Sequence, residues 1–211
     1  MMRRRPNGFS LIELLTVIAV IGILAAIILP IIKTIQERSR SSACASNMRQ
    51  LGQAILLYQA EHGSKLPPNY AFSGGAAAET WTVVVRPYLG IDDLQAYGQG
   101  TDLMCEALSC PSLEEEQNPD RWWESNYAVG IAFGTDGKSR TLADVDSSKV
   151  VMLAENNKPS VRCIRQSNGP WSYIGFNHDG YANIMFHDGH MTRWTVEDCP
   201  QDMDAPAWGI Q

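Results

Sequence analysis

An unbroken apolar segment near the N-terminus most constrains how this chain can fold. From Leu14 to Ile32, Thr16 is the only polar side chain. A helix of this length can cross the roughly 30 Å of bilayer hydrocarbon, so the segment predicts a membrane-spanning helix. Glu13 lies just at its start, and a carboxylate there costs about 2.5 to 3.5 kcal/mol on insertion into lipid. We therefore treat Glu13 as a candidate functional residue.

Two plainer interpretations of this segment are a secretory signal peptide and a signal anchor. A secretory signal has an apolar region of about 7 to 15 residues followed by a small-residue cleavage site. The segment here is too long and lacks such a site. The presence of Glu13 close to a Gly8-Phe9 junction argues against a plain signal anchor. The positive-inside rule places Arg3 to Arg5 in the cytoplasm and the C-terminal part outside, in a single-pass membrane protein.

The stretch GFSLIELLTVIAVIGILAAIILP, which begins at Gly8, resembles the signal and N-terminal helix of type IV pilins and type II secretion pseudopilins. This resemblance implies that a prepilin peptidase cuts after Gly8 and methylates Phe9. It also assigns assembly to Glu13 and a helix kink to Pro30. The expected function is a structural subunit, not an enzyme. Its expected partners are itself, other pilin-like subunits, an inner-membrane assembly platform and the lipid bilayer, in a periplasmic or surface filament of a type II secretion or type IV pilus machine.

The charges at the junction suggest a physical reason for assembly. Cleavage after Gly8 leaves a cationic α-amine on Phe9, about one helical turn from Glu13. Pairing between the amine of one subunit and Glu13 of its neighbour relieves the desolvation of both groups, and it favours a fixed axial stagger. We expect the helix to serve first as a membrane anchor and later as the filament core.

The predicted fold class is α+β, with a pilin-like architecture. A long N-terminal α-helix, transmembrane and then amphipathic, is expected from near Ser10 to Glu61 and to pack on an antiparallel β-sheet head. One helical face is predicted by residues at steps of three and four; they are Cys44, Met48, Leu51, Ile55, Tyr58 and His62. The expected parts are a leader at 1–8, the membrane and assembly half of the helix at 9–32, its amphipathic half at 33–62 and a β-rich head at 63–211.

Strands of the head are predicted from apolar and alternating segments. The segment Thr80–Tyr88 fits either a strand or a short helix, whereas Ser125–Phe133 and Lys149–Glu155 fit strands. A C-terminal antiparallel meander is expected at 171–196. Its three strand-like segments are Tyr173–Phe176, Tyr181–Phe186 and Met191–Val196, and they are separated by the turn signals Asp179-Gly180 and Asp188-Gly189.

A second resemblance involves the helix, the middle and the end of the chain. Asn47–Ala54, Leu66-Pro67-Pro68 and Cys110-Pro111-Ser112 resemble segments of a large pseudopilin-like subfamily with a C-terminal His-x9-Asp-Gly element. His178 and Asp188-Gly189 have that spacing. The His-x9-Asp-Gly element indicates which subfamily the head resembles, but it implies no mechanism.

The five cysteines are expected on the extracytoplasmic side, where disulfides persist. If the four head cysteines Cys105, Cys110, Cys163 and Cys199 pair among themselves, three connectivities are open, and Cys105–Cys110 with Cys163–Cys199 has the shortest first loop. A zinc site is the weaker alternative. The sequence has no C-x2-C pair, and its histidines and cysteines are not interleaved at ligand spacing.

Other metal sites are considered at the two His-Asp-Gly triplets. His187, Asp188 and His190 are close in sequence, but neighbouring side chains of a strand face opposite sides, so we favour a structural role in which Asp-Gly forms the turns and the histidines bond to loop carbonyls. No cofactor is expected, and calcium, which the pseudopilin resemblance suggests, is the alternative. Its candidate ligands would be Asp144, Asp146, Asp179 and Asp188.

Charge and motifs exclude other classes of function. The net charge of −6 falls to about −9 when the three leader arginines are removed, which disfavours nucleic acid as a partner. The sequence has no G-x-S-x-G, P-loop or H-E-x-x-H motif. The remaining alternative is a membrane-tethered binding module, in which a tryptophan-containing head recognises an extracellular polymer or protein.

Overall fold

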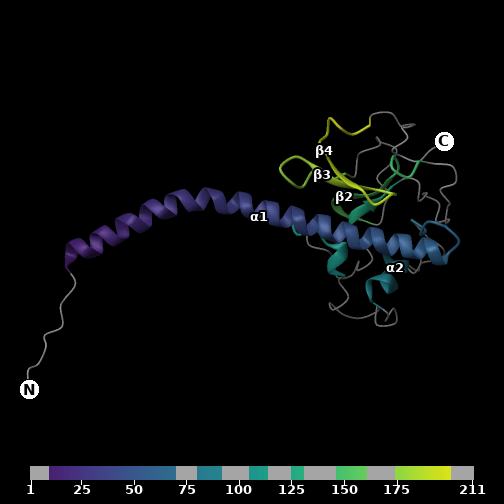
Figure 1. Ribbon diagram of the computed structural model, residues 1–211, viewed down its shortest axis with the longest axis horizontal. Helices are drawn as coiled ribbons and strands as arrows, with labels where there is room; N and C mark the ends of the chain where they lie inside the picture. The colour runs from purple at the N-terminus through teal and green to yellow at the C-terminus, as the bar shows by residue number, and fades with distance from the viewer. Residues whose placement is uncertain are drawn as a thin grey trace, which may run out of the picture. The chain divides into compact units, whose positions relative to one another are not determined.

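The structure is a computed structural model that describes residues 10–69, 80–91, 105–113, 125–130, 146–160 and 174–200 (Figure 1). Its Cα packing separates two units, Met1–Ser39 and Arg40–Gln211. The expected leader and the cleavage junction Gly8-Phe9 lie outside the described residues, as do Cys163 and Asp144.

The N-terminal unit consists, among the described residues, of the first part of helix α1 (Leu11–Glu61). The large apolar side chains between Leu11 and Ile35 are between 40% and 88% exposed. The helix continues through Pro30. Within the described residues, no other part of the chain buries this apolar surface. Helix α1 is long and apolar enough to cross a bilayer. This unit has the properties expected of a membrane anchor.

Helix α1 ends where the sequence predicted. Gly63 has a positive φ of 64°, and the N–H of Ser64 donates to the carbonyl of Gln59 at 2.8 Å. This is the hydrogen bond of a Schellman motif, which satisfies a carbonyl that the helix leaves open. The expected limits, from near Ser10 to Glu61, are confirmed.

The second part of α1 buries one face against the head. Cys44, Met48, Leu51 and Ile55 are fully buried, and Tyr58 is 9% exposed. The last member of the predicted face, His62, lies beyond the helix and is exposed, and its ring stacks on Tyr58 with centroids 3.9 Å apart. The spacing of three and four residues therefore predicted the packed face correctly from Cys44 to Tyr58, but not at His62.

The head contains a four-stranded antiparallel sheet in the order β1-β2-β3-β4. The strands are β1 (Ser125–Val129), β2 (Val151–Ser160), β3 (Ala182–Phe186) and β4 (Met191–Trp194). A tight turn at Asp188-Gly189 joins β3 to β4, with Met185 paired to Met191. The α+β, pilin-like fold class is confirmed.

The structure decides between two alternatives for one segment of the head and corrects the prediction for another. Thr80–Tyr88 forms helix α2 (Trp81–Val84) and the 3-10 helix η1 (Arg86–Leu89), so the helical alternative was correct. The first strand of the expected meander was wrong in its described part: Ile174 makes only an isolated bridge to Asn156. A Cβ on Gly175 would lie 2.3 Å from the Asn156 carbonyl oxygen, so the two segments are in close backbone contact at this point.

Both faces of the sheet are covered. One face shares a core with α1, which includes Leu51, Tyr127 and Met185, and the other face holds a smaller core with Ile184 and Phe186. The alternation of β3 explains this arrangement, because successive side chains of a strand point to opposite faces. A further 3-10 segment, η3 (Glu106–Leu108), leads into Cys110 and contributes Leu108 to the larger core.

Candidate functional site

The acidic residue at the start of α1 has a local hydrogen-bonding role. Glu13 Oε2 accepts a hydrogen bond from the backbone N–H of Ser10 at 2.8 Å, and the Glu13 carbonyl accepts one from Thr16 Oγ1 at 3.0 Å. Ser10 precedes the helix, and Glu13 is its third residue, so the carboxylate forms one half of a capping box. This role was not among the predictions from the sequence, although Ser10-x-x-Glu13 is the usual signature of a capping box.

The cysteines form a pair that the sequence did not favour. Cys44 on α1 is disulfide-bonded to Cys110, with a sequence separation of 66 residues. Because Cys110 pairs with Cys44, the four head cysteines do not pair among themselves, and the three connectivities left open for them are excluded. Cys105 and Cys199 are buried thiols, and burial, followed by the nearby Asp198, raises the pKa of Cys199 to about 11. The packing of α1 on the head brings Cys44 to Cys110, whereas the Cys105–Cys110 loop contains the short helix η3.

Polar contacts hold the loop that carries Cys110 against α1 and β1. Asn47 Nδ2 donates to the carbonyl oxygens of Glu106 at 3.1 Å and Ser109 at 2.8 Å. The backbone N–H of Cys110 donates to Asn126 Oδ1 at 2.9 Å. These bonds tie the backbone of the loop to a side chain of α1 and to a side chain of β1.

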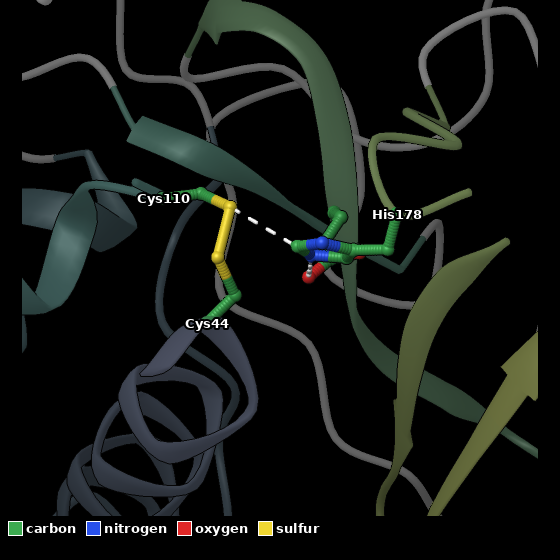
Figure 2. Close-up of side chains that lie close together, drawn as sticks. Cys44, Cys110 and His178 are labelled. Carbon is green, nitrogen blue, oxygen red and sulfur yellow. Dashed lines mark hydrogen bonds and ion pairs between the residues drawn. A yellow bond between two sulfur atoms is a disulfide. The ribbon is translucent and has the colours of Figure 1, made fainter. Parts of the chain in front are cut away.

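A buried histidine and a buried glutamate lie next to this disulfide. His178 Nε2 is 2.8 Å from Glu155 Oε1 and 3.9 Å from Cys110 Sγ, and Figure 2 shows the His178 ring facing the sulfurs. Both side chains are fully buried. Asn183 binds the same carboxylate, with its backbone N–H on Oε2 and its amide on Oε1, each at 2.8 Å.

His178 belongs to a motif that is visible in the sequence, whereas its partner Glu155 does not. His178 is held by a tight turn: it bridges to Tyr181, and Asp179 and Gly180 both have positive φ, which matches the predicted Asp-Gly turn. Glu155 had been assigned only as the end of a strand. A single acid at the end of the apolar run Val150–Ala154 was the available signal, because a buried carboxylate requires a partner.

The second His-Asp-Gly triplet has a different environment. Asp188 accepts hydrogen bonds from the backbone N–H of His190 at 3.0 Å and from its ring at 2.5 Å, and these bonds hold the pKa of Asp188 below its ordinary value. His187 is buried, and burial lowers its pKa to about 4. The turn at Asp188-Gly189 agrees with the structural role that we favoured, although His190 bonds to a carboxylate and not to a loop carbonyl.

The aspartates suggested for calcium do not gather in the described part of the chain. Asp146 bonds to Ser148 and forms an ion pair with Lys149 at 3.1 Å, while Asp188 bonds to His190. Within these residues, the group of potential metal ligands that lie together consists of Cys44, Cys110, Glu155 and His178. The structure thus places the candidate site between α1, β2 and the turn before β3.

Comparisons with known proteins agree with the N-terminal features. Residues 3–29 match the family described as "Prokaryotic N-terminal methylation motif". Residues 33–102 match a second family, described as a protein of unknown function, DUF1559. Together with the α+β fold, these matches support a pilin-like or pseudopilin-like protein that is anchored in a membrane.

Two characterised proteins are similar in sequence to part of this chain. The type IV major pilin protein PilA of Myxococcus xanthus is 49% identical over 47 residues, which are 22% of this chain and 21% of that protein. The type II secretion system core protein G of Pseudomonas aeruginosa is 27% identical over 62 residues, or 29% of this chain and 44% of that protein. The matches therefore span less than half of either relative. No solved structure matches the chain.

Proposed function

We propose that this chain is a pilin-like structural subunit that is made as a membrane-anchored precursor, cut between Gly8 and Phe9, and assembled into a type II secretion or type IV pilus filament. The observation that carries the proposal is the match of residues 3–29 to the N-terminal methylation motif. The exposed apolar surface of α1 supports it. A large exposed apolar surface marks a site of contact with a membrane or with another protein.

The proposed topology follows from the charges around the helix. Arg3, Arg4 and Arg5 precede the apolar segment and stay in the cytoplasm, so the head lies outside the inner membrane. The proposed partners are the prepilin peptidase, the assembly platform and other pilin-like subunits. The proposed role of Pro30 is to kink the helix, since proline removes one backbone donor from the helical ladder.

The N-terminus of the membrane-extracted protein tests the proposal. In cells that have a prepilin peptidase, mass spectrometry should find a chain that begins at methylated Phe9. Gly8→Ala serves as the matched variant and should retain the leader. A wild-type chain that keeps residues 1–8 in those cells would contradict the proposal and favour a membrane-tethered binding module.

A further inference from the structure

The buried group formed by Cys44, Cys110, Glu155 and His178 has the composition of a metal site. It offers two sulfurs, one imidazole nitrogen and one carboxylate oxygen, and these four atoms lie within 4.8 Å of one another. All four residues are buried, with 0% to 2% exposure. Structural zinc sites use these ligand types with four ligands in a tetrahedron.

The distances are close to those that zinc requires. With zinc–sulfur bonds of about 2.3 Å and zinc–nitrogen or zinc–oxygen bonds of about 2.0 to 2.1 Å, the edges of a tetrahedral site measure about 3.3 to 3.8 Å. His178 Nε2 lies 3.9 Å from Cys110 Sγ and 2.8 Å from Glu155 Oε1. The larger change is that the two sulfurs, now bonded, must separate.

The surrounding residues hold the four ligands in place independently of the disulfide. Asn126 fixes the backbone of Cys110, and Asn183 binds both carboxylate oxygens of Glu155. The Asp179-Gly180 turn holds His178, and α1 holds Cys44 in the core. Hydrogen bonds to ligating carboxylates commonly orient them for a metal.

We propose that the thiol form of this group is a zinc site, and that the Cys44–Cys110 disulfide is the alternative, metal-free form of the same link between α1 and the head. A newly made chain carries both cysteines as thiols. Zinc binding replaces the two thiol protons, which are released to solvent, and leaves the oxidation state of sulfur unchanged. The proton between His178 Nε2 and Glu155 Oε1 also leaves that contact, and the neutral imidazole carries its proton on Nδ1 when Nε2 binds zinc. Starting from the disulfide, a phosphine reductant first supplies two electrons and is converted to its oxide, with water providing the oxygen and two protons.

Cobalt and zinc titration of the full chain in detergent tests this proposal. The phosphine-reduced, metal-stripped protein should bind one equivalent of Co²⁺ with the visible bands of a tetrahedral site and a thiolate-to-cobalt charge-transfer band, and Zn²⁺ should displace it. The oxidised chain, which keeps the fold through its disulfide, should bind none. Equal binding by the oxidised and reduced chains would overturn the proposal, as would the absence of one-equivalent binding by the reduced chain.

Matched variants identify the ligands. Cys44→Ser should remove most of the charge-transfer band, whereas the double variant Cys105→Ser with Cys199→Ser should retain it, because those buried thiols lie outside the group. Asn183→Ala should weaken zinc binding by about 10- to 100-fold, as expected of an outer-shell partner. Unchanged binding in Cys44→Ser would overturn the assignment.

Folding of the His178→Gln and Glu155→Gln variants can be checked separately. Both keep the two cysteines, so formation of the Cys44–Cys110 disulfide with diamide reports whether the loop still reaches α1. A variant that forms this disulfide but loses tight metal binding supports direct ligation. A variant that forms it and binds zinc as tightly as the wild type shows that the residue is not a ligand.

Discussion

At the scale of single residues, Glu13 combines two roles that one substitution can separate. Its carboxylate caps α1 through the N–H of Ser10, and its charge is the proposed partner of the Phe9 amine. Glutamine can form the same capping bond without the charge. The local bond therefore does not account for a requirement for glutamate specifically.

We predict that Glu13→Gln leaves membrane insertion and helix capping intact but lowers incorporation into filaments. Glu13→Ala should impair incorporation and also remove the capping bond to the N–H of Ser10. Crosslinking between N-terminal helices, compared with the amount of membrane-inserted subunit, measures the effect. Wild-type incorporation of Glu13→Gln would contradict the charge-pairing mechanism.

His187 gives a prediction about pH. Burial lowers its pKa from 6.5 to about 4, so the unfolded chain takes up a proton between these values and the folded chain does not. The stability contributed by the neutral ring is fully present above pH 6.5 and is lost as the pH falls toward 4, at about 1.4 kcal/mol per pH unit.

Denaturant unfolding across this pH range should show a shallower loss of stability for His187→Gln than for the wild type. His62→Gln is the control, because His62 is exposed at the end of α1. If His187→Gln has the wild-type pH dependence, burial of His187 does not contribute to acid sensitivity.

At the scale of secondary-structure elements, the pairing of β1 with β2 includes a close backbone contact just after the end of β1. A Cβ on Gly130 would lie 1.9 Å from the carbonyl oxygen of Val151, a group that cannot move away as the end of a side chain can. The N–H of Gly130 donates to Met152 at 2.9 Å, which keeps the two chains together.

We predict that Gly130→Ala destabilises the head by about 3 kcal/mol or more, at or above the upper end of the usual cost of overpacking. Gly90→Ala is the matched control. Gly90 has a positive φ of 78° and open space around its Cβ position, so only the conformational cost of about 1 to 2 kcal/mol applies. Thermal unfolding compares the two, and equal losses would contradict the steric explanation.

Local elements were predictable from the sequence where one chemical signal determined them. The apolar run and the spacing of Cys44, Met48 and Leu51 predicted α1, and Asp188-Gly189 predicted the β3–β4 turn. The site was only partly predictable. His178 was identified by its motif, but Glu155 and Cys44 reach it through tertiary packing across more than twenty and more than one hundred residues of chain. No local spacing encodes that approach.

At the scale of the whole molecule, the Cys44–Cys110 disulfide closes a long loop and should provide much of the stability of the head. For a separation of 66 residues, the chain-entropy estimate is about 4 kcal/mol. We predict a loss of this order on reduction in the presence of a chelator, measured by denaturant unfolding. The double variant Cys105→Ser with Cys199→Ser is the control. Reduction of the Cys44–Cys110 disulfide should destabilise this variant by the same amount as the wild type.

The same link also determines how the subunit would carry a mechanical load. If tension is applied between α1 before Cys44 and the chain after Cys110, the covalent bond between the sulfurs carries it. The bypassed residues then experience no pull along the chain; they include the last turns of α1, as well as α2, η1 and η3. The packed face of α1 from Met48 to Tyr58 is therefore protected from being peeled off the head by force.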